Sequence, residues 1–325
     1  MPLPRRRFLH LAAGAVALPI TSRGARGEAF PARPVRVIVA FAPGGIGDLG
    51  ARLIGQSLQE RLQQPVVIEN RPGAGGNTGT EAVVRAPPDG YTMIWAGANN
   101  AINASLYDNL SYSFVRDIAA VGSVMRGPFV MTIHPSFPAR TVAEFIAYAK
   151  ANPAKINMAS PGAGTGPHVN GELFKMMTGV EMVHVPYRGD GPALIDLVAG
   201  QVQVMFGNLI SAMEHIRAGR LRALAVTTAM PSPALPDVPT VAATVPGYEA
   251  SAWFGLGAPR ATPAEVIAKL NKEINASLAD PKLAARLAEL GGAPMPLSQQ
   301  AFDAFIAAET EKWGKVVRMS GAKAN

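Results

Sequence analysis

The chain has 325 residues, of which 48% are hydrophobic and 16% are charged, a composition that excludes an intrinsically disordered protein and allows two domains of ordinary size. It contains no cysteine, which excludes disulfides, thiolate metal sites and cysteine nucleophiles. Five arginines and no acid lie in residues 1–27; the rest of the chain holds 25 basic residues (30 less these five) and 23 acidic ones, a net charge of +2 that does not suggest binding to nucleic acid or to a membrane surface.

The N-terminus has the parts of an export signal. Arg5, Arg6 and Arg7 precede an apolar run over residues 9–20, and small residues follow it. This run of about 12 residues is shorter than the roughly 20 that cross a bilayer. We therefore predict a twin-arginine-type signal peptide over residues 1–27, cleaved after Gly27 or Ala29, and a soluble periplasmic mature protein. A basic N-terminal arm is the alternative.

The first part of the mature chain alternates between predicted strands and helices. An apolar, β-branched run over 35–41 predicts a buried strand, and apolar residues over 49–62 recur at helical spacing. Two further strands are predicted at 66–68 and 92–95. A helix over 141–151 is expected to open with a capping box, Thr-x-x-Glu.

The alternation continues to the C-terminus. Strands are predicted at 156–159, 180–185, 201–206 and 221–227, with a helix from about Pro167 and a short one after Pro192. A second capping box over 262–265 opens helical patterns that run to Gly321. The pattern predicts an α/β architecture with largely parallel sheets, arranged as two lobes with a ligand between them.

A first glycine-rich loop, residues 42–48, lies between a predicted strand and a predicted helix. Glycines let backbone amides approach a ligand, and a helix N-terminus favours an anion. Gly45-x-Gly47-x-x-Gly50 also matches the dinucleotide fingerprint, with Glu69 about 20 residues on. Asp48 at the helix start would repel a pyrophosphate. An organic ligand, a dinucleotide and a purely structural turn capped by Asp48 all remain open from these residues.

A second glycine-rich loop covers residues 160–168. Thr165 is placed as the N-cap of the following helix, and Pro167 suits its first turn. The free amides and the Thr165 hydroxyl together predict a nest for a carboxylate. His168 falls in the first helical turn, where it either touches a ligand or packs.

Two other loops are weaker candidates. Ala98-Asn99-Asn100 follows the third strand, where asparagines hydrogen-bond a ligand or form a turn. Tyr187-Arg188-Gly189-Asp190-Gly191 lies between a strand and a helix, and Arg188 either pairs with a carboxylate or is a solvated surface residue.

Enzyme and metal motifs are missing from the sequence. It has no G-x-S-x-G, no H-E-x-x-H and no phosphate loop, and its histidines lack metal-ligand spacing. We expect no metal, no cofactor and no catalytic residues.

Five sequence blocks occur in order along the chain: Pro43-Gly44-Gly45-x-x-Asp48-x-x-Ala51-Arg52, Glu69-Asn70-Arg71-Pro72-Gly73-Ala74-Gly75-Gly76, Pro88-Asp89-Gly90-Tyr91-Thr92, Val185-Pro186-Tyr187-Arg188-Gly189 and Leu235-Pro236-Asp237-Val238-Pro239-Thr240. Together they resemble the extracytoplasmic solute receptors of the tripartite tricarboxylate transporter system, the Bug family. The resemblance covers roughly residues 30–320.

The resemblance implies a two-lobed periplasmic binding protein fold of type II character, whose lobes are joined by two crossing strands and close on a small carboxylate. Lobe 1 would comprise residues 28–124 and 226–325, and lobe 2 residues 125–225. The partners implied are a small organic acid and the subunits of a membrane permease, or a sensor; we expect a monomer. The candidate ligand-binding residues are Pro43, Gly44, Gly45, Ile46, Gly47, Asp48, Ala98, Asn99, Ser160, Gly162, Gly164, Thr165, Gly166, His168, Gly189, Asp190 and Asn208.

Three positions depart from the family pattern. Thr165 stands where serine is usual, which keeps the hydroxyl, while Gln203 and Gly207 stand where aspartate is common. The loss of negative charge would disfavour an amino-acid ligand and leave a plain carboxylate. The alternatives are an exported NAD(P)-dependent oxidoreductase that uses Gly45, Gly47, Gly50 and Glu69, and a periplasmic assembly factor that binds a protein.

Overall fold

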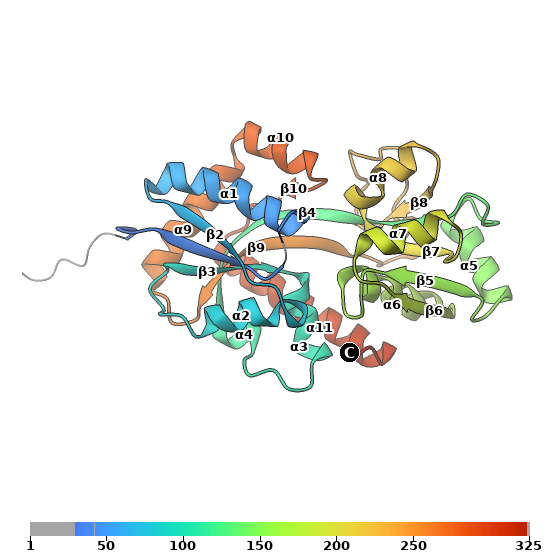
Figure 1. Cartoon of the computed structure of the whole chain (residues 1–325), viewed down its shortest axis with the longest axis horizontal. Coiled ribbons are helices and arrows are strands. Elements are labelled where there is room, and N and C mark those ends of the chain that lie inside the picture. Colours follow the sequence, from blue (N-terminus) through green and yellow to red (C-terminus); the bar gives the residue numbers. More distant parts are fainter. Residues whose placement is uncertain (1–29, 42, 324–325) are drawn as a thin grey trace, which may run out of the picture.

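The computed structural model describes residues 30–41 and 43–323, so the predicted signal peptide lies outside the described residues. Two lobes lie side by side along the long axis of the molecule, and two extended strands, β4 (Ile118–Ile133) and β9 (Ser251–Pro259), run between them (Figure 1). All strands belong to one ten-stranded sheet, because β4 pairs with neighbours in both lobes.

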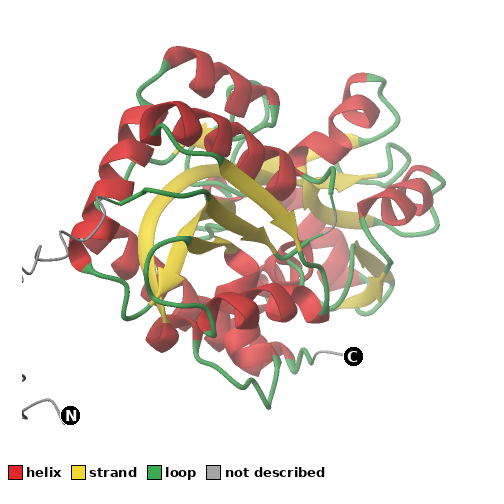
Figure 2. Cartoon of the chain, turned by 60° about the vertical axis from the view of Figure 1, so that its left-hand side comes forward, coloured by secondary structure: helices red, strands yellow, loops and turns green. Residues whose placement is uncertain are grey.

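Lobe 1 is built on parallel strands with helices around them. Its strands besides β4 and β9 are β1 (Val35–Val39), β2 (Val66–Asn70), β3 (Thr92–Gly97) and the short β10 (Ala293–Pro294). Its helices are α1 (Ile46–Leu62), α2 (Asn77–Val84), α3 (Ala98–Leu106), α4 (Phe114–Asp117), α9 (Ala264–Leu278), α10 (Pro281–Glu289) and α11 (Gln299–Ser320), with a 3-10 turn at Ala74–Gly76. Figure 2 shows helices on both sides of the strands.

Lobe 2 repeats this plan with fewer elements. Its strands are β5 (Ile156–Ser160), β6 (Met182–Pro186), β7 (Val204–Asn208) and β8 (Arg222–Val226), and its helices are α5 (Val142–Ala151), α6 (Gly166–Thr178), α7 (Asp190–Val198) and α8 (Leu209–Arg217). A 3-10 turn at Val241–Ala243 lies on the path from β8 to β9. The crossing from lobe 1 to lobe 2 lies within β4 itself, so the predicted boundary at 124/125 falls inside a continuous strand.

The prediction of an α/β architecture is confirmed, and the observed strand pairing shows which strands are parallel and which are antiparallel. Within each lobe β1, β2 and β3, and β5, β6 and β7, pair in parallel, as strand–helix alternation predicts. The crossing strands pair antiparallel with β3, with β7 and with each other. The prediction of largely parallel sheets was therefore wrong for the strands that connect the lobes.

The predicted caps had different outcomes. The Thr141 hydroxyl accepts the Glu144 amide at 3.1 Å and so caps α5, as predicted. The Glu144 carboxylate accepts the Arg140 amide at 2.6 Å instead of the Thr141 amide, so the reciprocal half of the predicted capping box is not formed. The second capping box was wrong: α9 starts at Ala264 with Pro263 as its N-cap, and the buried Thr262 hydroxyl has no hydrogen-bond partner among the described residues. Pro263 can take no part in a reciprocal cap because it has no amide hydrogen.

The last helix, α11, contacts both lobes. α11 starts in lobe 1 and packs against α3 there, and its C-terminal half packs against α6 of lobe 2. Val316 and Val317 are buried in an apolar cluster that contains residues of both lobes. Across residues 30–41 and 43–323, none of the helices has both the length and the apolar character that a membrane span needs.

Candidate functional site

A cleft of about 500 Å³ lies between the lobes. Its walls carry most of the candidates named from the sequence: Gly44, Gly45, Ile46, Gly47, Asp48, Ala98, Asn99, Gly164, Thr165, Gly166, Asp190 and Asn208. Five candidates lie outside the lining: Pro43, Ser160, Gly162, His168 and Gly189. Residues more than 160 positions apart in the sequence thus meet around one cavity.

Five helices begin at this cleft. The first residues of α1 and α3 face it from lobe 1, and those of α6, α7 and α8 face it from lobe 2. Amides in the first turn of a helix have no acceptor within that helix, and the helix dipole places positive potential there. Among the described residues that line the cleft there is no Lys, Arg or His. An anion in this cavity would therefore be held by amides and dipoles.

Asp48 braces the first loop. Its carboxylate accepts the Gly44 amide at 2.9 Å, the Arg52 side chain at 3.0 Å and the Asn70 amide group at 2.9 Å. Burial raises the pKa of Asp48, but the hydrogen bonds from Arg52, Gly44 and Asn70 outweigh it and hold the pKa below its ordinary value. Of the alternatives for this loop, a structural turn held by Asp48 is close to what is observed. The N-cap residue of α1 is Gly45, however, and not Asp48.

The same contacts join two of the sequence blocks. Asn70 donates to the Phe41 carbonyl at 3.0 Å as well as to Asp48, and accepts a hydrogen bond from Arg52 at 3.1 Å. Thus the block that starts at Glu69 fixes the loop of the block that starts at Pro43. These contacts give Asp48, Arg52 and Asn70 a structural role within blocks that are otherwise rich in glycine.

Of the three glycines in the dinucleotide fingerprint, Gly45 and Gly47 line the cleft, whereas Gly50 serves packing. A Cβ on Gly50 would lie 3.0 Å from the Met125 sulfur and 3.2 Å from Trp95, and Gly50 is outside the cleft lining. Glu69 also lies outside it, paired with Arg71 and Arg36. Neither residue is placed to contact a nucleotide in the cleft.

In the second loop, Thr165 occupies the N-cap position of α6, as predicted from sequence. Its hydroxyl donates to the Gly162 carbonyl at 2.7 Å, so that proton is already engaged within the loop. His168 is buried and accepts the Gly164 amide through Nδ1 at 2.9 Å. Both side chains therefore shape the loop, and the Gly166 amide at the start of α6 lies in the cleft lining without an acceptor in the helix.

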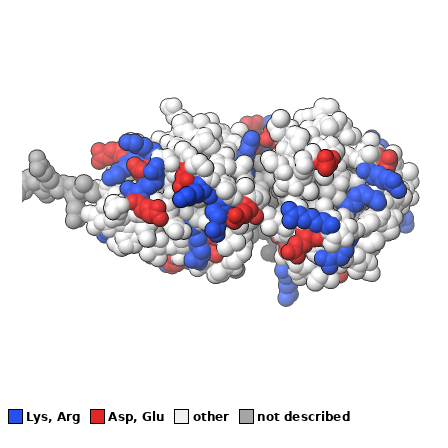
Figure 3. Space-filling view, turned by 90° about the horizontal axis from the view of Figure 1, so that it is seen from above, with Lys and Arg blue, Asp and Glu red and all other residues white. Residues whose placement is uncertain are grey.

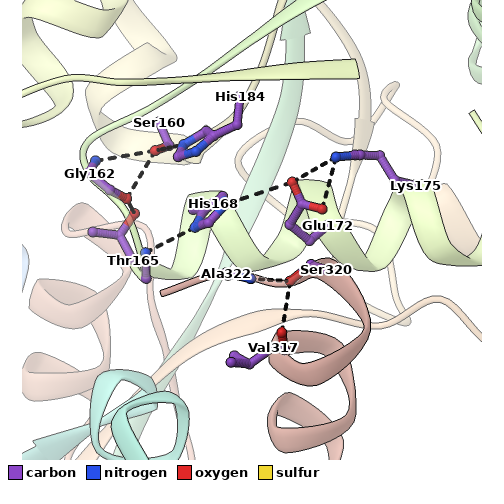
Figure 4. Close-up of polar contacts among 11 residues, drawn as sticks. Ser160, Gly162, Thr165, His168, Glu172, Lys175, His184, Val317, Ser320 and Ala322 are labelled. Carbon is purple, nitrogen blue, oxygen red and sulfur yellow. Dashed lines mark hydrogen bonds and ion pairs between the residues drawn. The ribbon is translucent and has the colours of Figure 1, made fainter. Parts of the chain in front are cut away.

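A chain of polar contacts supports this loop from behind (Figure 4). The rings of His168 and His184 stack with centroids 3.7 Å apart, and His184 Nε2 lies 2.6 Å from the buried Ser160 hydroxyl. Burial, together with the nearby His168, lowers the pKa of His184 to about 4. His184 is thus neutral near pH 7, and its Nε2 lies within hydrogen-bond distance of the Ser160 hydroxyl, which also lies 3.0 Å from the Gly162 carbonyl oxygen.

Glu172 and Lys175 complete that chain on α6. Glu172 Oε1 lies 3.7 Å from His168 Nε2 and 3.0 Å from Lys175 Nζ. Burial raises the pKa of Glu172, but the nearby His168 ring and the hydrogen bond from Lys175 outweigh it and hold the pKa below its ordinary value. Because Ser160 and His168 are buried and outside the cleft lining, this cluster positions the loop and does not present a nucleophile.

Lobe 2 also contributes a hydrogen-bonded pair of polar side chains, Asp190 and Asn208, to the cleft. Asp190 is the first residue of α7, and its Oδ2 accepts the Asn208 side chain at 2.9 Å. Burial raises the pKa of Asp190, although hydrogen bonds from Asn208 and Ser211 oppose the shift. All three residues line the cleft.

The sequence analysis missed most of the apolar wall. The lining includes Phe41, Leu49, Leu106, Tyr107, Phe129, Ile210, Trp253, Phe254 and Leu290. Phe41, Leu49 and Ile210 keep more than a third of their surface exposed, so part of this apolar wall is open to solvent. Gly75 also lines the cleft. It belongs to the sequence block that starts at Glu69, which carries the family resemblance, but no residue of that block was predicted to bind the ligand. On the face seen in Figure 3, Lys and Arg side chains are mixed with Asp and Glu side chains.

Comparison with known proteins identifies the fold and the family. A family model described as the tripartite tricarboxylate transporter family receptor matches residues 50–322. The chain belongs to this family. Its members are solute receptors and not enzymes, which removes the oxidoreductase alternative.

Relatives cover nearly the whole chain. Protein BugT of Bordetella pertussis is 36% identical over 97% of this chain and 96% of its own length. The solved structure of Rpa4515 from R. palustris with adipate is 38% identical, has a TM-score of 0.80, and covers 90% of this chain and 99% of that one. MatC (Rpa3494) from Rhodopseudomonas palustris with bound malate is 34% identical, with a TM-score of 0.76, over 89% of this chain and all of that one. The fold is that of the mixed α/β periplasmic binding proteins.

Proposed function

We propose that this protein is an exported receptor that binds a small organic carboxylate with an apolar body between its two lobes. It would pass the ligand to the membrane subunits of a tripartite tricarboxylate-type transporter, or report it to a sensor. The observation that carries the proposal is the convergence of five helix N-termini on a cavity whose lining offers no cationic side chain among the described residues.

The polar groups suit the ends of such a ligand. One carboxylate would lie against the start of α6, where Gly166 lines the cavity and its amide has no acceptor within the helix. The far end would meet the first turns of α1 and α3 in lobe 1, where the Asn99 side chain and the α1 amides lie. Binding of one ligand by both lobes would favour the closed arrangement, which is the form a permease or a sensor would recognise.

The apolar wall suits the ligand's body. Phe41, Phe129 and Phe254 can cover a hydrocarbon chain. Several of the polar side chains in the lining already hydrogen-bond within the protein, among them Asp48, Thr165 and Asn208. Adipate, an unbranched dicarboxylate, is the ligand seen in a relative 38% identical. We therefore infer that this chain prefers dicarboxylates with an apolar spacer over hydroxy acids of the malate type.

The periplasmic location belongs to the same proposal. It rests on the basic and apolar N-terminal sequence and on relatives described as periplasmic binding proteins. A monomer with an open path to the cleft is sufficient for this role.

Isothermal titration calorimetry on protein refolded to remove carried-over ligand tests the proposal. The panel is adipate, its uncharged analogue adipamide, malate and NAD. We expect a single site for adipate, weaker binding of malate and none of adipamide. Phe254→Ala should weaken adipate binding, whereas Ile195→Ala, on an exposed face of α7 outside the cleft lining, should not. Equal binding of adipate and adipamide, or no carboxylate bound, would overturn the proposal.

A further inference from the structure

We propose that Tyr107 and Asn99 form a subsite in lobe 1 that binds the second carboxylate of the ligand, so that the receptor selects dicarboxylates over monocarboxylates of the same chain length. This inference rests on the proposed function, since it assigns a role within the same cleft. It adds two side-chain donors to the backbone amides already described, and it states which class of carboxylate the cleft takes.

A stripe of polar side chains runs along α3 and ends at the residue that caps this helix. Asn99, Asn103 and Tyr107 are spaced four residues apart, which places them on one face of the helix, and Tyr107 is its C-cap residue. All three residues line the cleft. The stripe therefore belongs to the lobe 1 wall of the cavity.

Gly75, in the 3-10 turn at Ala74–Gly76, brings these side chains to one place. Its carbonyl accepts the Asn99 side chain at 3.3 Å and the Asn103 side chain at 3.0 Å. A Cβ on Gly75 would lie 2.8 Å from the Tyr107 hydroxyl oxygen, so this hydroxyl occupies the space that a side chain would fill. Gly75 itself lines the cleft. The Tyr107 hydroxyl and the Asn99 amide group thus lie around the same cleft residue.

Two donors of this group are left for a ligand. Asn103 Nδ2 donates both to the Gly75 carbonyl and to Asn77 Oδ1, at 2.9 Å for the latter, so its two hydrogens are engaged. Asn99 Nδ2 donates to Gly75 alone and keeps its second hydrogen, at an exposed contact. The Tyr107 hydroxyl has no hydrogen-bond partner among the described residues, and it is not one of the fully buried unpaired atoms, so it keeps accessible surface.

The other hydroxyl groups of the lining are engaged within the protein. The Thr165 hydroxyl donates to the Gly162 carbonyl, and the Ser211 hydroxyl hydrogen-bonds the Asp190 carboxyl group. Among the described residues of the lining, Tyr107 is therefore the hydroxyl that stays available to a ligand.

This pair of donors suits a carboxylate and does not suit an apolar end. A carboxylate offers two oxygens that only accept, one for the Tyr107 hydroxyl and one for the Asn99 amide hydrogen. The methyl end of a monocarboxylate would displace water from both donors and leave them without an acceptor, which is costly. With one carboxylate at the start of α6 in lobe 2, the second carboxylate of a dicarboxylate would therefore lie at this subsite in lobe 1.

Calorimetric titrations with adipate and with hexanoate, which has the same carbon chain and one carboxylate, test this subsite. The wild type should bind adipate more tightly than hexanoate. Tyr107→Phe should raise the Kd for adipate roughly 10- to 150-fold, the loss of one hydrogen bond to a charged group, and should leave the Kd for hexanoate unchanged. Asn99→Ala should act in the same direction. Tyr148→Phe is the matched control, because Tyr148 lies on α5 outside the cleft lining, and it should change neither Kd.

The outcomes separate the two proposals. Equal binding of adipate and hexanoate by the wild type overturns the subsite and leaves the receptor function standing. An unchanged Kd for adipate in Tyr107→Phe does the same, and so does an equal rise for both ligands, because the hydroxyl would then shape the cleft without contacting the second carboxylate. Failure of every carboxylate to bind the wild type overturns the receptor function and the subsite together.

Discussion

Gly164 is the point at which the second loop touches lobe 1, and an alanine there should specifically impair ligand binding. A Cβ on Gly164 would lie 1.9 Å from Leu106 Cδ2 on α3, far inside the ordinary carbon–carbon contact distance of about 3.5–4 Å. Gly164 also has a φ of +74°, a left-handed conformation that disfavours other residues.

These two costs act on different equilibria. The left-handed backbone costs about 1 kcal/mol whether or not the lobes touch, so it lowers stability and leaves the Kd unchanged. The overlap with Leu106 exists only when lobe 2 lies against α3, and overpacking of this kind costs about 1–3 kcal/mol. If ligand binding favours that arrangement, the Kd of Gly164→Ala should rise roughly 5- to 150-fold.

Calorimetry with adipate, together with thermal melts of each variant, measures both effects. Gly179→Ala is the matched control, because Gly179 has a φ of +70° and a Cβ there meets nothing within 4 Å. It should lower the melting temperature and leave the Kd unchanged. Adding Leu106→Ala to Gly164→Ala should recover binding relative to Gly164→Ala alone. Equal Kd values for the wild type and Gly164→Ala would refute this reasoning.

Three further predictions address the walls and supports of the cleft. Across a series of dicarboxylates from succinate to suberate, each added methylene that the cleft buries should contribute about 0.8 kcal/mol, a fourfold fall in Kd measured by calorimetry; a flat series would contradict the apolar wall. Asp48→Ala should lower the free energy of unfolding by about 1–3 kcal/mol in urea titrations, since three donors lose their acceptor. The lowered pKa of Asp48 means that its contribution is fully present above the unfolded value of about 3.8 and is lost as pH falls through the folded value, so wild type and variant should converge in acid and not at pH 7. Glu309 accepts the indole N–H groups of Trp253 and Trp313 at 3.1 and 2.8 Å; Glu309→Leu should therefore destabilise by roughly 2–5 kcal/mol and Glu309→Gln by less, and equal melting temperatures would exclude this role.

The sequence predicted the local elements near the cleft well, because their signals are local. The strand at 35–39, the glycine loops and the N-cap at Thr165 follow from residues within a few positions of one another. The two long crossing strands were not found from the residues. β4 and β9 are buried on both faces and contain small residues and glycine, so they show neither alternation nor a strong β-branched run. Their existence was implied only by the family resemblance.

The composition of the cleft was also only partly predictable. Glycines and polar residues at loops could be proposed because their chemistry is visible, but the apolar wall joins Phe41, Phe129 and Phe254 from distant parts of the chain. Nothing local distinguishes these residues from core residues. In the same way, the Thr165 hydroxyl was expected to face a ligand, whereas the structure shows that it donates to Gly162, a choice that depends on loop geometry.

The central claim is that amides at converging helix N-termini hold the ligand's negative charge. Backbone amide NMR during a titration with adipate tests it most directly. The account predicts saturable downfield shifts at Gly166 in lobe 2 and at the first turns of α1 and α3 in lobe 1, with the same Kd at each and no such shifts with adipamide. Shifts confined to sites outside the cleft, or identical shifts with adipamide, would contradict it.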